Sequence, residues 1–417
     1  MKLSRRSVIR FSGITAAMLA LSGCTGTANS GFSISSFVKS LAGGSASSSS
    51  AASSTAASGA AASSAAESTV AASQAASSQI DAAYSQADLP AYDANPLTGE
   101  ARTSDSRIVG VMVNNISNSQ RQNARPQRGI GSADILIESK VEGGITRFCA
   151  VYSDADSIPE VGPMRSGRDQ FLQLIMPWQA LYYHDGESAP CTKFINVYNY
   201  SGLNIGGKSY FNTPTHAHVA HRDSRGRDVA YEHTEFTSGK EIKQAASNAN
   251  ISLKHSYDST FFNFTDYRTG EVNTLSGKRS GQSVSITHSD NYKTSFKYDS
   301  WSKTYKMSMY SHADKAVSKT VDELTNTQLA FDNVLVCFAS IAAYDGNSGD
   351  VQEVKYIEGG QAYLFTYGGV QTGRWEKASP EHPLYVYDDN GAQMQLNRGK
   401  TYLAIVDDDE WSNFSYR

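Results

Sequence analysis

The sequence lacks the short motifs by which many enzymes are recognised. It contains no Gly-x-Ser-x-Gly, no phosphate-binding loop, no Cys-x-x-Cys, no His-Glu-x-x-His and no Gly-x-Gly-x-x-Gly followed by an acidic residue. Four cysteines without regular spacing do not describe a disulfide framework. Cys149 and Cys337 lie in apolar runs and are predicted to be small core residues. Cys191 is expected in a loop near His184, where a catalytic thiol stays open as an alternative.

Positive charge and long apolar runs are also scarce, which limits the partners. The chain has 37 basic and 41 acidic residues, a net charge of −4. The export signal described below carries four basic residues and no acid, so the mature chain is about −8. An acidic body gives no electrostatic support for binding nucleic acid. After the first 24 residues no apolar run approaches the 18 residues of a membrane-spanning helix, and no motif calls for a cofactor.

The first 24 residues are predicted to be a lipoprotein signal peptide. A basic start is followed by the apolar stretch Phe11–Gly23, which is too short to span a membrane as a stable helix. Leu21-Ser22-Gly23-Cys24 resembles the bacterial lipobox, which implies that a diacylglyceryl group on Cys24 anchors the mature chain to the extracytoplasmic face of the cell membrane. Ser4–Arg10 resembles a twin-arginine signal, but paired arginines also occur in Sec signals, so the export route stays open.

Residues 25–88 are predicted to be a disordered linker. From Gly43 to about Ser78 they are almost all Ser and Ala, and such a segment cannot bury enough apolar surface to offset the entropy of ordering. Folded sequence runs from Leu89 to Arg417, a length that favours two domains. We expect these domains at residues 89–240 and 251–417, joined by a helical stretch over Gly239–Asn250.

The pattern of apolar runs predicts the α+β class. In residues 89–240 the strand-like runs IVGVMVN, ADILIES, GITRFCAVY and ALYYH alternate with helical segments at Phe171–Ile175 and Thr192–Tyr198. This order favours an N-terminal α/β domain with a mixed sheet, in which ligands bind at strand ends. From Ile251 onward, short strands separated by glycine-containing turns predict an all-β domain that is barrel-like or sandwich-like.

The most informative stretch is Ala124–Arg168, in which charged residues flank two strand-like runs. They are Arg125, Asp134, Glu138, Glu142, Arg147, Arg165 and Arg168. Pro163 suits the first position of a helix, so Arg165 and Arg168 are expected to share a helix face. Arginines at a helix start and at strand ends predict a pocket for an anion. The alternative is an internal Arg–Glu network that ties the elements together.

A second polar segment, residues 213–238, is predicted to be a long loop rich in histidine. Imidazole and carboxylate groups suit zinc, so His216, His218 and His221 are weak candidates for metal ligands. The preferred alternative is that His216, His218, His221 and His233 are four solvated histidines, because they lie on one loop without a rigid scaffold, and no metal is assigned. His184-Asp185, at the end of a predicted strand, suits either an acid–base pair or a structural role.

Several of these segments resemble the YerB-type family of bacterial surface lipoproteins. The resemblance covers Pro96–Val406 and rests on PLTG, VGVMVNN, ARPQRGIGSADILIESKVEGGITRF, VGPMRSGRDQF, HRDSRGRD, YEHTEFTS, FDNVLVCFA and NRGKTYLAIV. It implies a two-domain layout but no established biochemical function. The residues that match its motifs are Arg125, Glu138, Glu142, Arg147, Arg165, Arg168, Arg222, Asp223 and His233. We expect these residues and His184 to bind the ligand, although Thr234 stands where the family pattern has Asn.

Three functions are compatible with these features. The leading one is a membrane-anchored lipoprotein, not an enzyme, whose Arg/Glu pocket binds an anionic component of the cell envelope or a partner protein. The second is an envelope enzyme acting on phosphate or cell-wall glycan bonds, because a strand followed by a Pro-x-Arg segment loosely resembles the LytR-CpsA-Psr type of polymer ligases. The third is a structural or assembly lipoprotein without a ligand. Arginines that line a cleft would favour the first two functions, and arginines capped by carboxylates the third.

Overall fold

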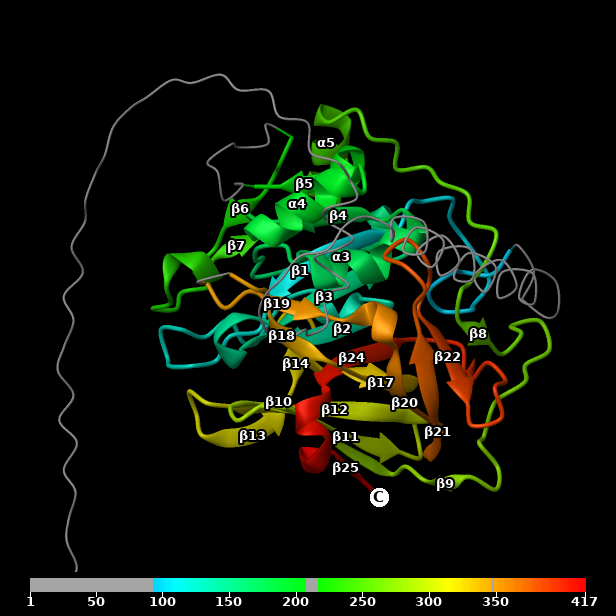
Figure 1. Ribbon diagram of the computed structural model, residues 1–417. Helices are drawn as coiled ribbons and strands as arrows, with labels where there is room; N and C mark the ends of the chain where they lie inside the picture. Colours follow the sequence, from blue (N-terminus) through cyan, green and yellow to red (C-terminus); the bar gives the residue numbers. More distant parts are fainter. Residues whose placement is uncertain (1–92, 208–216, 347–348) are drawn as a thin grey trace, which may run out of the picture. The chain divides into compact units, whose positions relative to one another are not determined.

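A computed structural model describes residues 93–207, 217–346 and 349–417. The predicted signal peptide with Cys24, the predicted linker and His216 therefore lie outside the described residues. The central feature of the described part is a mixed sheet of eleven strands (Figure 1). In spatial order its strands are β22 (Tyr385–Asp388), β21 (Gly369–Glu376), β20 (Gly360–Thr366), β17 (Asn333–Ala339), β24 (Thr401–Asp407), β2 (Ile135–Lys140), β3 (Thr146–Tyr152), β1 (Val109–Asn114), β4 (Leu181–His184) and β5 (Asn204–Gly206), and β9 (Arg279–Ser280) pairs with β21.

This sheet joins strands from both halves of the folded chain. β2 pairs in parallel with β24, from Ile135 opposite Thr401 to Ser139 opposite Ile405. Every residue of β17 and β24 is buried. Both faces of these two strands must therefore be covered by other elements, as is usual for strands in the interior of a large sheet. The predicted α+β class, the mixed sheet and the strand-rich C-terminal part are confirmed. The C-terminal strands divide between this sheet and a second one.

The second sheet is antiparallel and lies below the central sheet in Figure 1. Its six strands are β13 (Ala316–Lys319), β12 (Thr304–Ser311), β11 (Tyr292–Asp299), β10 (Ser283–Ser289) and β25 (Ser415–Tyr416), with β16 (Ala330–Phe331) paired to β12. Four two-stranded sheets complete the described strands: β14 (Val321–Asp322) with β15 (Thr327–Gln328), β18 (Ile341–Ala343) with β19 (Gln352–Val354), β8 (Asn263–Phe264) with β23 (Gln395–Leu396), and β6 (His221–Arg222) with β7 (Glu235–Phe236).

Two apolar cores cover the two faces of the central sheet. On one face, Met112, Ile137 and Cys149 pack with Phe171 and Phe194 of the helices α3 (Asp169–Ile175) and α4 (Ala189–Val197). On the other face, a second core combines the alternate side chains of β1, β2 and β3 with the inner face of the six-stranded sheet and with helix α5 (Gly239–Asn248). No helix in the described ranges is both long enough and apolar enough to cross a membrane.

The helices correct one part of the sequence prediction. α4 and α5 lie close to the expected ranges, and α5 begins with a capping box in which the Ser238 side chain accepts from the backbone N–H of Glu241. α3, however, begins only at Asp169, and Arg168 is its N-cap. Pro163 therefore does not start a helix, and the prediction that Arg165 and Arg168 share a helix face is wrong. The preceding segment pairs with β1 instead, where Met164 bridges Val113.

The loop assignments also change. Cys191 lies inside α4 and is completely buried, so it is a core residue rather than a loop thiol. The three cysteines among the described residues, Cys149, Cys191 and Cys337, are free and buried. The described part of the histidine-rich segment contains β6, β7 and a 3-10 turn over Tyr231–His233. Cys191 changes assignment because α4 begins at Ala189, three residues before the predicted start at Thr192.

Candidate functional site at the carboxyl edge of the sheet

The strand directions bring several polar residues to one edge of the central sheet. β2, β24 and β17 run parallel to one another, as do β1, β4 and β5, and β3 runs antiparallel to both β1 and β2. All these parallel strands therefore end at one edge, where β3 begins. Asn114, Lys140 and His184 end β1, β2 and β4, and Arg147 lies one residue after the start of β3. Ligands of α/β sheets bind at such an edge.

The sheet nevertheless separates the ten predicted ligand-binding residues. Successive side chains of a strand point to opposite faces. Arg147 is two residues from Cys149 on β3, so its side chain points to the same face, toward α3. Glu138 is two residues from Leu136 on β2, so its side chain points to the other face, toward the six-stranded sheet. The ten residues therefore do not share one pocket. Nine of them divide into an arginine cluster beside α3, a buried network between the sheets, and contacts of the segment 217–238, and His184 is buried separately at the end of β4.

The arginine cluster consists of Arg147, Arg165, Arg168 and Glu142. The Arg168 Nε donates to Glu142 Oε1 at 2.5 Å, and Arg147 Nη2 lies 3.7 Å from Glu142 Oε2. Backbone carbonyls of Ser166 and Gly167 accept further bonds from Arg147 and Arg168, each at 2.7 Å. Glu142 sits in a turn with Gly143 and Gly144, whose φ angles of 64° and 67° require glycine. Two guanidinium groups therefore share one carboxylate.

Positive charge in the arginine cluster is only partly neutralised. Arg147 is 4% exposed, and its Nε is buried without a hydrogen-bond partner among the described residues. Burial and the neighbouring charge of Arg168 hold the pKa of Arg147 well below its usual value. Burial alone would raise the pKa of Glu142, but the charges of Arg168 and Arg147 outweigh it and lower that pKa. Arg165, 31% exposed, has its nearest carboxylate 3.9 Å away on Glu232.

Glu138 lies in a buried network between the two sheets. Its carboxylate accepts from Asn115 at 3.1 Å, from Thr146 at 2.7 Å, from Thr294 at 2.9 Å and from Tyr402 at 2.6 Å. It is 1% exposed. Four donors for a buried carboxylate satisfy it internally, so Glu138 is not available to a ligand.

Arg125 belongs to the same buried network. Its Nε donates to Asn115 Oδ1 at 2.9 Å, and Nη1 donates to the Tyr310 carbonyl at 2.7 Å. Burial lowers the pKa of Arg125, and Glu138 opposes that shift. Arg125 also lines a cavity of about 180 Å³ together with Gln127, Asp314, Lys319 and the buried Met309 and Ser311 of β12. The charge of Asp314 opposes that of Arg125 there, and Arg125 already donates to Asn115 and to the Tyr310 carbonyl.

Arg222 takes part in an acidic cluster that sequence reasoning did not find. Its Nη2 donates to Glu235 Oε2 at 2.5 Å and lies 3.8 Å from Asp185 Oδ2, and His218 Nε2 lies 3.0 Å from Glu235 Oε1. Burial and the adjacent Glu235 raise the pKa of Asp185 to about 6. Asp185 directly follows β4, so its place at the strand end was visible in the sequence. Glu235 was not, because its neighbours come from distant segments.

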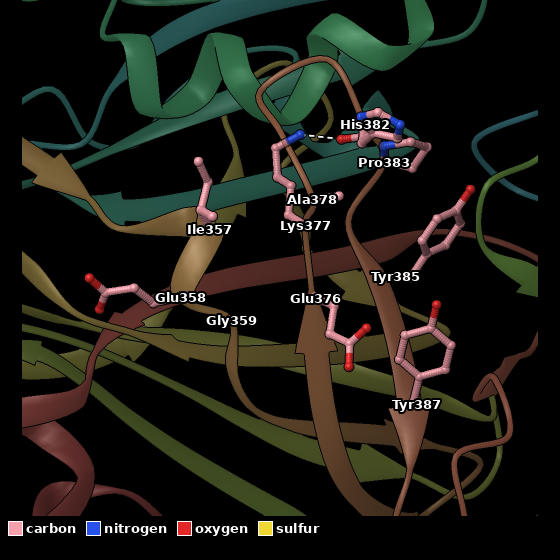
Figure 2. Close-up of a pocket in the computed structure, with 10 residues that line it drawn as sticks. All are labelled: Ile357, Glu358, Gly359, Glu376, Lys377, Ala378, His382, Pro383, Tyr385 and Tyr387. Carbon is pink, nitrogen blue, oxygen red and sulfur yellow. Dashed lines mark hydrogen bonds between the residues drawn. The ribbon is translucent and has the colours of Figure 1, made fainter. Parts of the chain in front are cut away.

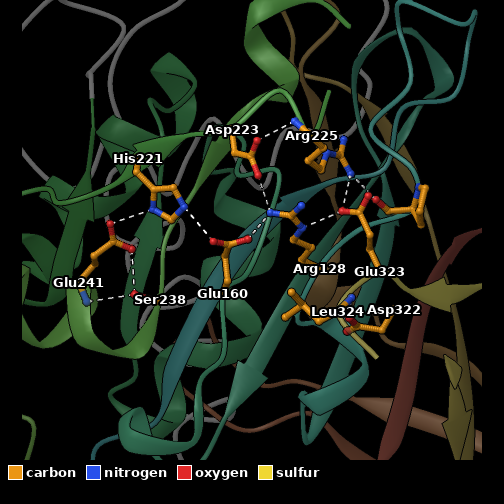
Figure 3. A network of polar contacts seen from close by, with 11 residues as sticks. Arg128, Glu160, His221, Asp223, Arg225, Ser238, Glu241, Asp322, Glu323 and Leu324 are labelled. Atoms are coloured by element: carbon orange, nitrogen blue, oxygen red, sulfur yellow. Dashed lines mark hydrogen bonds and ion pairs between the residues drawn. The ribbon is translucent and has the colours of Figure 1, made fainter. Parts of the chain in front are cut away.

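Asp223 belongs to a charged network on the surface (Figure 3). Its Oδ2 accepts from Arg128 Nη1 at 2.7 Å, and Arg128 also pairs with Glu160 and Glu323. Glu160 in turn bonds His221 Nε2 at 3.0 Å, and His221 Nδ1 lies 2.9 Å from Oε1 of Glu241 in α5. Burial acts to lower the pKa of His221, but the two carboxylates outweigh it and raise that pKa. The network ties the 217–238 segment to the rest of the fold.

The predicted histidines are structural where they are described. His184 is fully buried, and its ring nitrogens are bonded to the Gly186 carbonyl and to Asn204. His233 is fully buried between Asn114 and Gln122, and burial lowers its pKa to about 4. The preferred interpretation of solvated histidines is therefore wrong for His233. Within the residues the structure describes, no group of three His, Cys, Asp or Glu side chains is arranged to hold a metal ion.

A further cavity, of about 210 Å³, lies between β22 and the turn around Ile357 (Figure 2). Lys377 lies at its wall, and its Nζ donates to the carbonyls of Pro380 and His382. Burial lowers the pKa of Lys377 to about 7. Because the amine is occupied by two carbonyls of the following turn, Lys377 holds that turn in place and is not free for chemistry.

The matches to known proteins agree with this architecture. Two profiles of one family, described as a protein of unknown function (DUF3048), match its N-terminal domain at residues 97–252 and its C-terminal domain at residues 284–403. The chain belongs to this two-domain family, and the resemblance to YerB-type proteins is confirmed. "Putative lipoprotein YerB" of Bacillus subtilis (strain 168) is 28% identical over 322 residues, which cover 75% of this chain and 86% of that protein.

A solved relative has the same fold. The crystal structure of YerB protein from Bacillus subtilis matches with a TM-score of 0.61 and 24% identity, covering 78% of this chain and 99% of the crystallised one. The crystallised chain therefore folds without a counterpart of about a fifth of this chain.

Proposed function

We propose that this chain is a lipid-anchored extracytoplasmic protein that binds an anionic group of a cell-envelope component at the arginine cluster. One observation carries the proposal: Arg147 and Arg168 share the single carboxylate of Glu142, and the Nε of Arg147 is left without a partner among the described residues. Arg165 supplies a third cation that is open to solvent. A phosphate or carboxylate oxygen suits such a site, because guanidinium groups bind these anions through two parallel hydrogen bonds.

The anchor is supported by the N-terminal sequence and by the name of the relative. Cys24 follows Leu-Ser-Gly after a short apolar stretch, and the relative from Bacillus subtilis is described as a lipoprotein. Acylation of Cys24 would hold the folded part at the extracytoplasmic face of the membrane, within reach of anionic lipids, wall polymers and surface proteins.

Thermal melting with added anions tests the binding site. We expect pyrophosphate and glycerol phosphate to raise the melting temperature of the wild type, because a ligand that binds only the folded state stabilises it. Arg165→Ala should abolish that gain. Arg121→Ala is the matched control, since Arg121 is an exposed arginine paired to Asp228 away from the cluster. Equal gains in both variants, or no gain in the wild type, would contradict the proposal.

A second candidate function is hydrolysis at the acidic cluster of Asp185 and Glu235. The observation in its favour is that the pKa of Asp185 is raised to about 6 beside Glu235, with Arg222 nearby. Cleavage of a phosphate or glycan bond needs a proton donor and benefits from a cation that stabilises negative charge. The test is release of product from cell-wall glycan and from aryl phosphates. Activity that Asp185→Asn removes would favour the enzyme, and no activity in the wild type would exclude it for these substrates.

A further inference from the structure

The six-stranded sheet carries positive charge that the rest of the folded chain lacks. Residues 93–417 have a net charge of −6, yet the segment 292–319, which forms β11, β12, β13 and their turns, contains six basic and two acidic residues. The charge therefore concentrates on strands β11, β12 and β13 and on the turns that join them.

Strand registers place four of these lysines on one face. The inward side chains of β11 and β12, including Phe296 and Met307, belong to the core between the sheets. Their neighbours in sequence therefore point outward. The outward lysines are Lys293 and Lys297 on β11, Lys306 on β12, and Lys319 on β13, which lies opposite the outward Ser308. We call these four residues the lysine face.

The lysine face holds like charges close together. Lys297 lies directly opposite Lys306 in the antiparallel pair, an arrangement that destabilises a sheet. Among the described residues, none of the four lysines has a carboxylate within the 4.0 Å of an ion pair, although Asp299 on the same face feels the charge of Lys306. Positive groups that the fold leaves unpaired fit an external anion.

An exposed tryptophan lies at the end of the lysine face. Trp301 is 93% exposed, at the turn between β11 and β12. Indole rings favour the boundary between water and lipid headgroups, because one side of the ring is apolar and the N–H can be hydrated. Lysines beside a tryptophan match a surface of anionic phospholipid more closely than they match a soluble anion.

We propose that the lysine face and Trp301 dock the folded part on an anionic phospholipid surface. The docking rests on the lipid anchor proposed above, because acylation of Cys24 would attach the same chain to such a surface. The docked sheet lies flat on the headgroups, and Trp301 enters the interface. This surface is distinct from the arginine cluster, so the two proposals can fail separately.

Sedimentation with vesicles tests the docking. Residues 93–417 serve as the protein, since the crystallised relative folds over the corresponding 78% of this chain and this part lacks Cys24. We expect binding to vesicles of phosphatidylcholine with about 30 mol % phosphatidylglycerol, and loss of binding at high salt or on pure phosphatidylcholine. Lys297→Ala with Lys306→Ala should weaken the partition by about 25-fold, or about fivefold for each lysine.

Matched variants give the controls. Lys240→Ala with Lys254→Ala removes the same charge away from the lysine face and should leave binding unchanged. Trp301→Ala should weaken binding, and the tryptophan emission of the wild type, but not that of Trp301→Ala, should shift to shorter wavelength on the anionic vesicles. Wild-type protein that stays in solution, or equal binding by the two double variants, would overturn the proposal. The proposal would also be overturned if soluble polyphosphate fully displaced the protein from the vesicles and Trp301→Ala had no effect. That result would identify a soluble polymer as the ligand. Arg165→Ala should bind vesicles normally.

Discussion

Replacing Arg168 by Ala should destabilise the fold, whereas replacing Arg165 by Ala should not. The Arg168–Glu142 contact is 2.5 Å long, and the two side chains are 10% and 20% exposed. Breaking a fully buried pair costs about 3–5 kcal/mol. Glu142 keeps some contact with water and with Arg147 at 3.7 Å, so we expect about 2–3 kcal/mol. A chain of this size then loses about 5 °C in melting temperature.

The Arg165 variant supplies the contrast. Its 3.9 Å contact with Glu232 joins side chains that are 31% and 43% exposed, and such surface pairs contribute about 0–1 kcal/mol. Thermal melting at pH 7 without added anions measures both variants. A double variant, Arg168→Ala with Glu142→Gln, removes the stranded charge and should recover part of the loss. If Arg165→Ala lost as much stability as Arg168→Ala, the assignment of Arg165 as the weakly paired cation of the cluster would be refuted.

Three further predictions concern single residues. Glu138→Ala should cost on the order of 3–5 kcal/mol in urea unfolding, because it leaves four buried donors without their acceptor. The pKa of His233 is about 4 in the folded state and about 6.5 in the unfolded state, so as the pH falls the unfolded state is protonated at His233 before the folded state is. The free energy of unfolding of the wild type should therefore fall between about pH 6.5 and 4. His233→Gln should make this pH dependence weaker. Cys24→Ala should abolish incorporation of radiolabelled palmitate, and equal labelling of both proteins would contradict acylation at this residue.

The apolar periods of the sequence determined the secondary structure well. The runs ending at Asn114, Ser139, Tyr152 and His184 form strands, and the α+β class follows from their alternation with helices. The family resemblance was equally readable, since it depends on motifs that are contiguous in sequence. These properties are local: each depends on residues within one strand, turn or motif.

Tertiary structure alone decided which charged residues meet. The alternation of side chains across β2 and β3 sends Glu138 and Arg147 to opposite faces, although both lie in the same informative stretch. The late start of α3 removes Arg165 from the helix, because the segment before Asp169 pairs with β1. Glu235 approaches Asp185 only through folding of segments 50 residues apart. Contacts of this kind depend on strand register and sheet order, which no local pattern in the sequence encodes.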